Sequence, residues 1–212
     1  MNKERTLILL KPDSVARGIV GEVLTRYERV GLKIVAMKML FATDKQLEEH
    51  YYKDDEWLIE KGKGIIKNKG YKADYDPKKA GKEITDGLVT DMKLSPIIAM
   101  VLQGHNAVEV VRKITGPTNI KDAPPGTIRG DYSHDTYALA NISDRPIITI
   151  VHASGAIDEA KKEIDIWFKP NEIFEYTKPH DNLHYRGLKW DYYSLECLML
   201  VKELMQVLCK RN

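Results

Sequence analysis

Cysteines and long apolar runs are scarce in this chain. Cys197 and Cys209 are the only two cysteines, and no paired cysteine spacing occurs elsewhere, which argues against a disulfide framework and for reduced thiols. The longest apolar runs, such as residues 97–102, are far too short to span a bilayer. The opening residues Met-Asn-Lys-Glu-Arg show no signal peptide. We therefore expect a cytoplasmic protein without a membrane segment.

An excess of charge of either sign is also lacking. The 33 lysines and arginines nearly balance the 31 aspartates and glutamates, so overall charge neither favours nor excludes an anionic partner. With 212 residues the chain can bury a sizeable core. A single domain spanning residues 1–212 is the simplest organisation.

Apolar patterning predicts an α+β fold. Buried strands are expected at residues 7–10, 32–40, 97–102 and 147–151. Helix starts are expected at Asp13 or Ser14, at the capping-box patterns that begin with Thr43 and Asn106, and at Ile157. This order of elements predicts a ferredoxin-like, four-stranded antiparallel sheet with helices packed on one face.

The segment 147–156, which reads Ile-Ile-Thr-Ile-Val-His-Ala-Ser-Gly-Ala, is the most informative stretch. Its apolar and β-branched residues predict a buried strand that ends at a lone histidine, His152. The end of a strand that faces the start of a helix is a common position for ligands. An imidazole with an ordinary pKa of about 6.5 is largely neutral at neutral pH and can act as a nucleophile. Taken alone, a histidine at the end of a strand is more often a structural residue than a nucleophile.

Two further motifs accompany this histidine. The first strand runs into Leu-Lys-Pro-Asp at residues 10–13, and a loop rich in proline and glycine contains Pro-Gly-Thr-Ile-Arg-Gly-Asp at 125–131. Together with His-Ala-Ser at 152–154, and in this order, the motifs resemble those of the nucleoside diphosphate kinases. The resemblance implies a ferredoxin-like fold. It also implies transfer of the γ-phosphoryl group of a nucleoside triphosphate to a nucleoside diphosphate, by a ping-pong route through a phosphohistidine.

The resemblance assigns roles around the histidine. His152 matches the nucleophile, Glu163 matches the carboxylate that orients it, and Ser154 matches a hydroxyl beside both. Tyr51 matches a tyrosine that lines the histidine pocket. A glutamate on an exposed helix face is the ordinary alternative for a residue such as Glu163 considered without the motif.

The resemblance also assigns the groups that bind phosphate. Phosphoryl transfer has a loose, anionic transition state, so a protein contributes mainly position and positive charge. Arg112 and Arg129 match the two arginines that grip the phosphates, and Thr118 matches a hydroxyl donor in the same loop. Lys11 matches the lysine that reaches the sugar and the terminal phosphate. A solvated surface charge is the alternative for any of these cations taken singly.

Mg²⁺ is expected to accompany the substrate because it offsets the charge of a polyphosphate. The sequence shows no dedicated protein cage for this ion. His180 and His184 stand four residues apart in a polar stretch, and we interpret them as surface residues. No metal site built by the protein is predicted.

Three positions depart from the family pattern. The asparagine three residues before the nucleophile is Thr149, which weakens an expected contact with the ribose. An aspartate that supports the site is absent at Gly155. The family holds the base between apolar side chains, one of which is usually phenylalanine; here that position falls on Ile84, and Leu88 matches the other contact. We expect activity to survive because none of the three departures removes the nucleophile or the phosphate arginines.

Relative to the family, insertions are expected at about 53–83 and 132–146. The first is rich in lysine between Lys61 and Lys82, with Tyr71 and Tyr75 interleaved. We interpret it as a solvated surface loop. Two alternatives remain open: a loop that binds nucleic acid through phosphate contacts and stacking, and a lid over the nucleotide.

A C-terminal helical extension is expected at 186–212, where Ser194 can cap a helix that runs through Cys209. Its apolar face is expected to pack on its own chain or on a neighbour. The resemblance implies a homo-oligomer, a tetramer or hexamer built from dimers.

Two rival functions follow from the same residues. The first is a homologue with weakened catalysis that binds nucleotides, or nucleic acid through the lysine-rich segment. The second is a phosphohistidine donor that uses His152 with a different acceptor. The presence of His152, Glu163, Arg112 and Arg129 together favours the nucleoside diphosphate kinase reaction over both.

Overall fold

The computed structural model describes residues 3–69, 72, 74–178 and 181, and those up to Glu175 belong to one compact unit. Among the described residues after Glu175, the Asp181 N–H donates to the carbonyl of Lys178 over 2.9 Å. The helix expected at 194–209 lies outside the described residues, as do His180 and His184.

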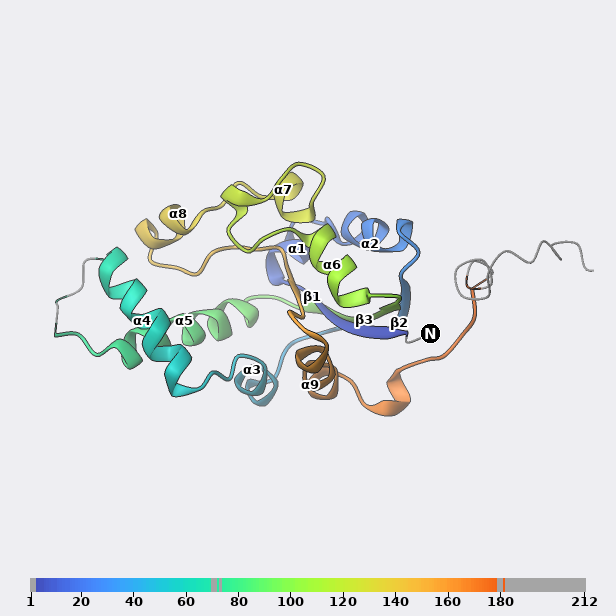
Figure 1. Ribbon diagram of the computed structural model, residues 1–212, viewed down its shortest axis with the longest axis horizontal. Coiled ribbons are helices and arrows are strands. Elements are labelled where there is room, and N and C mark those ends of the chain that lie inside the picture. Colours follow the sequence, from blue (N-terminus) through green and yellow to red (C-terminus); the bar gives the residue numbers. More distant parts are fainter. Residues whose placement is uncertain (1–2, 70–71, 73, 179–180, 182–212) are drawn as a thin grey trace, which may run out of the picture. The chain divides into compact units, whose positions relative to one another are not determined.

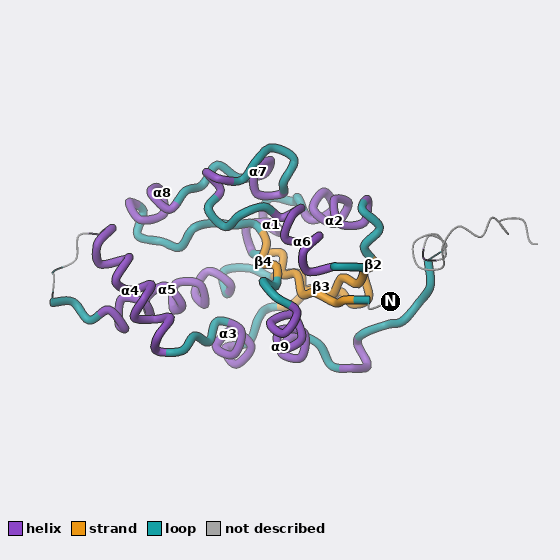
Figure 2. Tube along the Cα trace, in the orientation of Figure 1, coloured by secondary structure: helices purple, strands orange, loops and turns teal. Residues whose placement is uncertain are grey.

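Four strands form one antiparallel sheet (Figures 1 and 2). They are β1 Glu4–Leu10, β2 Lys33–Leu40, β3 Ile97–Gly104 and β4 Val151–Ala153. The order across the sheet is β2-β3-β1-β4, which confirms the ferredoxin-like architecture. Because β1 is central, the residues at its end lie beside both β3 and β4.

Helices and short turns connect these strands. The helices are α1 Pro12–Ala16, α2 Val20–Arg29, α3 Asp44–His50, α4 Asp55–Lys69, α5 Pro77–Met92, α6 Ala107–Thr115, α7 Ile128–Tyr132, α8 Tyr137–Ile142 and α9 Ile157–Trp167. Two 3₁₀ turns, η1 Ile120–Asp122 and η2 Pro170–Glu172, complete the order. Among the described residues, no helix combines the length and the apolar character needed to cross a membrane.

Of the helix caps predicted within the described residues, one is present in the structure and two are not. The capping box of Thr43 is confirmed, since its hydroxyl accepts the N–H of Gln46 and the Gln46 side chain accepts that of Thr43. The box predicted at Asn106 is wrong, because this residue adopts a left-handed conformation (φ 48°) and makes no side-chain cap. The cap predicted at Asp13 or Ser14 is also wrong, because α1 begins one residue earlier, at Pro12.

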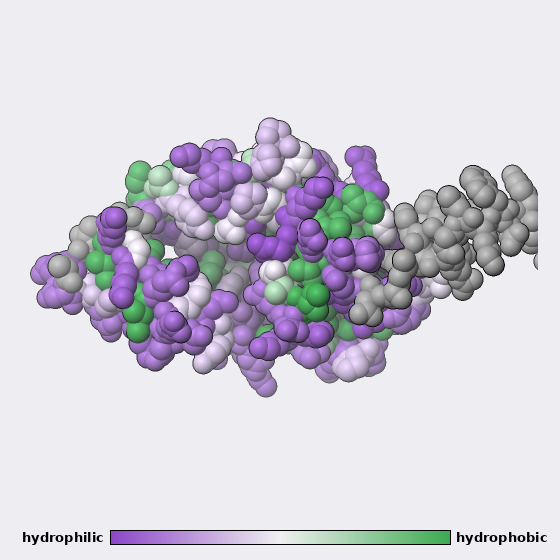
Figure 3. All heavy atoms as spheres, viewed as in Figure 1, coloured by the Kyte–Doolittle hydropathy of each residue, from purple (hydrophilic) through white to green (hydrophobic). Residues whose placement is uncertain are grey.

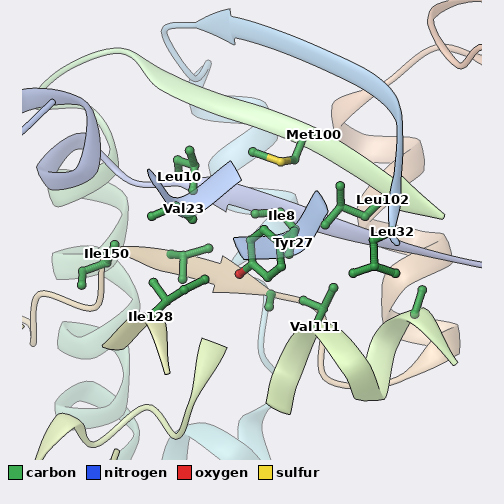
Figure 4. Close-up of a cluster of buried hydrophobic side chains, with 13 residues drawn as sticks. Ile8, Leu10, Val23, Tyr27, Leu32, Met100, Leu102, Val111, Ile128 and Ile150 are labelled. Carbon is green, nitrogen blue, oxygen red and sulfur yellow. The ribbon is translucent and has the colours of Figure 1, made fainter. Parts of the chain in front are cut away.

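Helices cover both faces of the sheet, which corrects the prediction of one covered face. Ile8 and Leu10 of β1 pack with residues of α2 and α6 on one side, the cluster drawn in Figure 4. Leu7 and Leu9 pack with residues of α3, α5 and α9 on the other. Successive side chains of a strand point to opposite faces, and these four are fully buried, so each face requires its own layer.

The fourth strand starts later than predicted. Residues 147–150 do not pair with β1, because the Val151 N–H donates to the carbonyl of Thr149 over 2.6 Å across Ile150, which has a φ of +66°. This γ-turn reverses the chain just before β4. Ile147 instead packs with Ile120 and Ala140. The apolar run therefore reflects burial under neighbouring segments as well as strand pairing.

The lysine-rich segment is helical, so its interpretation as a loop is wrong for the described residues. The described residues of 53–83 contain α4 and the first half of α5, and these helices lie side by side as a hairpin (Figure 1). Asp54 accepts the N–H of Trp57 and Asp76 accepts that of Lys78, so an aspartate caps each helix start. Gly62 and Gly81 permit close packing, because a Cβ at either would collide with the backbone of the other helix.

Candidate active site

A cavity of about 790 Å³ lies beside β4 and α6 and extends to α5, and Figure 3 shows the surface hollowed between α8 and the α4–α5 hairpin. Its volume falls within the roughly 300–1,000 Å³ typical of ligand pockets. The predicted site residues that line it are Lys11, Tyr51, Ile84, Leu88, Arg112, Thr118, Arg129, Thr149 and His152. Ser154 and Glu163 are not part of the lining. They are buried.

The histidine lies within β4, opposite Leu9 of β1, rather than after the strand. Its Nε2 lies 2.8 Å from Oε1 of Glu163 on α9. The approach does not have hydrogen-bond geometry, so Nε2 has no hydrogen-bond partner among the described residues. Catalytic hydrogen bonds are often poorly aligned without substrate and tighten when it binds. With Nε2 facing Glu163, Nδ1 is the ring nitrogen left for a reaction.

The carboxylate of Glu163 is held from behind. Its Oε2 accepts the hydroxyl of Ser154 over 2.6 Å, and that hydroxyl oxygen accepts the N–H of Leu7 over 3.2 Å. Burial raises the pKa of Glu163, and His50 and the Ser154 hydroxyl partly offset this effect. Ser154 thus connects the first strand to the carboxylate that faces His152.

The electrostatics keep His152 neutral. Burial lowers its pKa well below the ordinary value, and the positive charge of Lys11 and Arg129 lowers it further, against a smaller opposite effect of Glu159. An unprotonated imidazole keeps a lone pair on one nitrogen. The site therefore holds the histidine in its nucleophilic form at neutral pH.

His50 is a part of this site that sequence reasoning missed. Its ring lies edge-on to that of His152, with centroids 4.4 Å apart, and its Nδ1 accepts the indole N–H of Trp167 over 3.3 Å. Nδ1 also lies 3.5 Å from Oε1 of Glu163. Burial lowers the pKa of His50, so it is a neutral neighbour of His152. The only signal in the sequence was a histidine on the apolar face of α3.

His50, His152 and Glu163 also form a group whose possible ligand atoms lie within 4.8 Å of one another. Two imidazole nitrogens and one carboxylate oxygen suit Zn²⁺ better than Mg²⁺, which prefers oxygen ligands and retains water. This cluster is therefore not a Mg²⁺ site.

Lys11 supplies a half-buried cation at the end of β1. Its N–H donates to the carbonyl of Ile150 over 2.9 Å, which ties the end of β1 to the γ-turn before β4. Burial lowers the pKa of Lys11 to about 8, with Asp13 and Arg129 acting in opposite directions. The ammonium group is thus poised to lose its proton only slightly above neutral pH.

Arg129 on α7 is a second cation of the site, and it is buried. Its guanidinium donates to three backbone carbonyls, those of Gly116 (2.8 Å), Val151 (2.8 Å) and Thr149 (3.3 Å), and lies 3.5 Å from the Thr118 hydroxyl. Burial lowers its pKa to about 10, so it stays charged at neutral pH. Arg112 on α6 lines the same part of the cavity.

The place of the missing aspartate is occupied by another carboxylate. The Gly155 N–H donates to Oε2 of Glu159 over 2.6 Å, and a Cβ at Gly155 would lie 2.6 Å from that oxygen. The same Cβ would lie 3.6 Å from Nη1 of Arg112. Glu159 therefore places negative charge where a side chain at Gly155 would stand. Sequence reasoning missed it because the acid comes from the next turn of the chain.

Comparison with known proteins decides the family. The family model described as nucleoside diphosphate kinase matches residues 4–58 and 56–173. The chain belongs to the nucleoside diphosphate kinase family. It is 45% identical over 183 residues to the nucleoside diphosphate kinase of Pyrobaculum aerophilum, which covers 82% of this chain and all of that one. The enzyme of Pyrococcus furiosus is 40% identical over 178 residues, covering 84% of this chain and 91% of its relative.

Solved structures of the nucleoside diphosphate kinase family show the same fold. A crystal structure of the kinase from Pyrobaculum aerophilum superposes with a TM-score of 0.77 at 43% identity, covering 82% of this chain and 100% of that one. A transition-state mimic of the kinase from Borrelia burgdorferi, with bound vanadate and ADP, gives a TM-score of 0.71 at 36% identity, covering 86% and 97%. The family resemblance seen in the sequence and the fold that it implied are confirmed.

Proposed function

We propose that this nucleoside diphosphate kinase moves the γ-phosphoryl group of a nucleoside triphosphate to a nucleoside diphosphate through a phosphohistidine at His152. The observation that carries the proposal is the orientation of this imidazole, with Nε2 at 2.8 Å from Glu163 and the ring in the wall of the cavity. The reaction class agrees with the family to which the chain belongs.

The chemistry follows from that orientation. Nδ1 of His152 attacks the γ-phosphorus, a bond from nitrogen to phosphorus forms, and the bond to the β-phosphate oxygen breaks. The nucleoside diphosphate leaves with its oxygen unprotonated. The Nε2 proton stays on the ring, and Glu163 stabilises the positive charge that the phosphorylated imidazole carries. The acceptor diphosphate then reverses each step.

The other predicted residues serve this transfer by position and charge. Lys11, Arg112 and Arg129 place cations along one part of the cavity, which suits a chain of phosphates. The hydroxyl of Tyr51 is buried and has no hydrogen-bond partner among the described residues, so it is free to donate to a bound phosphate. The Thr118 hydroxyl accepts a hydrogen bond from the Arg129 guanidinium over 3.5 Å and so adds a hydroxyl beside this cation.

The nucleotide is proposed to carry Mg²⁺ into the site. The described carboxylates that line the cavity are Glu83, Asp144 and Glu159, and Glu159 is already engaged with the Gly155 N–H. The ion would be held mainly by phosphate oxygens and water, as Mg²⁺ usually is. Its contribution when bound is to offset phosphate charge.

Oligomer formation through β2 is part of the proposal. β2 is an edge strand of the sheet, and the exposed fractions of Met37 (54%), Met39 (59%) and Phe41 (66%) are high for apolar residues. An edge strand with exposed apolar side chains favours pairing with a second copy. A homo-oligomer built from dimers, tetrameric or hexameric, fits this surface, and sizing by light scattering tests it. A cytoplasmic location, expected from the sequence, fits work on free nucleotides.

The segments 53–83 and 132–146 are proposed as additions to a family framework within one domain. They fold as the hairpin and as the α8 segment, outside the four strands of the sheet. Three lysines of the hairpin are paired with carboxylates, Lys61 with Glu60 (2.8 Å), Lys78 with Asp55 (2.7 Å) and Lys82 with Asp86 (3.3 Å), which makes these three less available to nucleic acid.

Intact mass spectrometry with ATP and Mg²⁺ tests the mechanism. We expect an acid-labile phosphoryl adduct on the wild type and none on His152→Ala, and we expect GDP to discharge the adduct with GTP appearing. An adduct that GDP does not discharge would assign a different acceptor. The absence of any adduct would overturn the proposed mechanism.

A further inference from the structure

The cavity extends beyond the cations that receive phosphates. Its far part is formed by the α4–α5 hairpin and the α8 segment, and Figure 2 shows these helices at a distance from β4. The walls there are largely apolar or aromatic: Trp57, Ile65, Ile84 and Leu88 from the hairpin, and Tyr137 and Ala140 from α8. Once the phosphates of a nucleotide occupy the cationic part, its flat aromatic base faces these walls.

The packing of the hairpin places Trp57 in this wall. A Cβ at Gly81 would lie 2.0 Å from the carbonyl oxygen of Leu58, and a Cβ at Gly62 would lie 1.7 Å from that of Pro77. The two helices therefore run antiparallel in this register, and Trp57 lies level with the turn of α5 that contains Ile84. The indole is half-buried, and the Lys53 ammonium lies 5.8 Å from the ring centroid.

The opposite wall is held in place by two contacts. Arg145 pairs with the buried Asp135 through two hydrogen bonds of 2.7 and 3.1 Å, which anchors the loop after α8. Pro146 approaches α5 so closely that a Cβ at Gly87 would lie 2.9 Å from its Cγ. The loop after α8 and the hairpin thus meet at Gly87.

We infer that Trp57 stacks on the base of the bound nucleotide, so that the inserted hairpin supplies an aromatic contact that the aliphatic Ile84 lacks. The inference rests on the proposed function, because it takes the phosphates to lie against the cations. Stacking on an aromatic ring tolerates any base, since every base has a flat π-face. The hairpin would therefore strengthen nucleotide binding without selecting adenine or guanine.

Calorimetry with three probes tests the role of Trp57. With Mg²⁺ present, ADP and GDP report the whole site, whereas inorganic tripolyphosphate reports only the cationic part. We expect Trp57→Ala to weaken ADP and GDP binding by about 10-fold and to leave tripolyphosphate binding unchanged. Trp57→Phe should bind nearly as the wild type does. Ile59→Ala is the matched control, because Ile59 lies on the same helix, is 38% exposed and does not line the cavity.

Fluorescence gives a readout that does not depend on how the alanine variant folds. The difference in emission between wild type and Trp57→Phe isolates Trp57, and we expect ADP but not tripolyphosphate to quench it. Unchanged ADP affinity in Trp57→Ala, or equal losses for ADP and tripolyphosphate, would overturn the inference. If ADP binding depends on Trp57 while ATP leaves no adduct on His152, the inference stands and the proposed mechanism fails.

Discussion

Glu163 and His152 face each other across 2.8 Å, between a carboxylate oxygen and the inner nitrogen of the imidazole. The contact commits Nε2 to the protein interior and leaves Nδ1 as the nitrogen proposed to receive the phosphoryl group. Because a second residue behind the carboxylate, Ser154, fixes it to β1, the direction of the nucleophile is set by the sheet itself.

Removing the charge at Glu163 should slow phosphorylation. In Glu163→Gln the imidazole loses the anion that orients it and stabilises its positive product, so we expect the rate of phosphohistidine formation to fall about 10- to 100-fold. Rapid-quench mass spectrometry measures this rate. Asp165→Asn is the control, an exposed acid on the same helix, and should react at the wild-type rate. An unchanged rate in Glu163→Gln would contradict the orienting role.

Lys11 should set the alkaline limb of activity. The pKa of this residue is about 8 in the folded chain without nucleotide, so the ammonium loses its charge as pH rises through that value. Since kcat/KM reports the free enzyme, kcat/KM for ATP should decline above about pH 8. In Lys11→Arg the cation stays charged, and the limb should move to higher pH even if the maximum rate falls. A limb in the same place in both proteins would assign it to another group.

The hydroxyl of Ser154 should matter for both stability and rate. Ser154→Ala leaves the Glu163 carboxylate and the Leu7 N–H without this buried partner, which we expect to cost about 1–3 kcal/mol of unfolding free energy. Urea denaturation measures the loss, and phosphohistidine formation should slow as well. Ser143→Ala, at an exposed position after α8, should change neither. A stable but slow variant would separate orientation from stability.

Asp135 should stabilise the fold in a manner that depends on pH. Burial alone would raise its pKa, but hydrogen bonds from Arg145 and from the N–H groups of Ile148 and Thr136 outweigh it and lower the pKa below 3.8. The stabilisation is therefore complete above the unfolded pKa and is lost as pH falls through the lowered folded value. We expect Asp135→Asn to cost about 1–3 kcal/mol at pH 7 and progressively less below pH 4, measured by urea unfolding. A difference that stays constant down to pH 2 would rule out the ionised pair as its source.

Local patterns predicted most of the framework. The continuous apolar run of β1 and the apolar stripes of α2 and α9 can be read directly from the order of residues, and the three motifs identified the family. The limits appeared where tertiary packing decides the backbone. The run 147–151 reads as a strand, yet the turn at Ile150 and burial of Ile147 beside Ala140 remove most of it from the sheet.

The sequence predicted the residues of the site that lie in contiguous motifs, but not those that the fold brings to them from other elements. Lys11, Arg129 and His152 could be named because each sits in a contiguous motif. His50, Glu159 and Trp57 could not, since their roles depend on distances between elements that no spacing in the sequence encodes. The lysines of α4 indicated only an exposed surface. They gave no sign that Trp57 and Ile65, on the same helix, line a cavity.

Arg129 joins two separate stretches of backbone, one at Gly116 and the other at Thr149 and Val151, and its side chain lies beside the cavity. A single side chain thus holds together the loop before α7 and the γ-turn that precedes His152. The proposed binding of phosphate and the position of His152 therefore both depend on the Arg129 side chain. Heat or denaturant that breaks the Arg129 contacts should abolish phosphate binding and the positioning of His152 in one step. A partly unfolded molecule would then be inactive rather than slow.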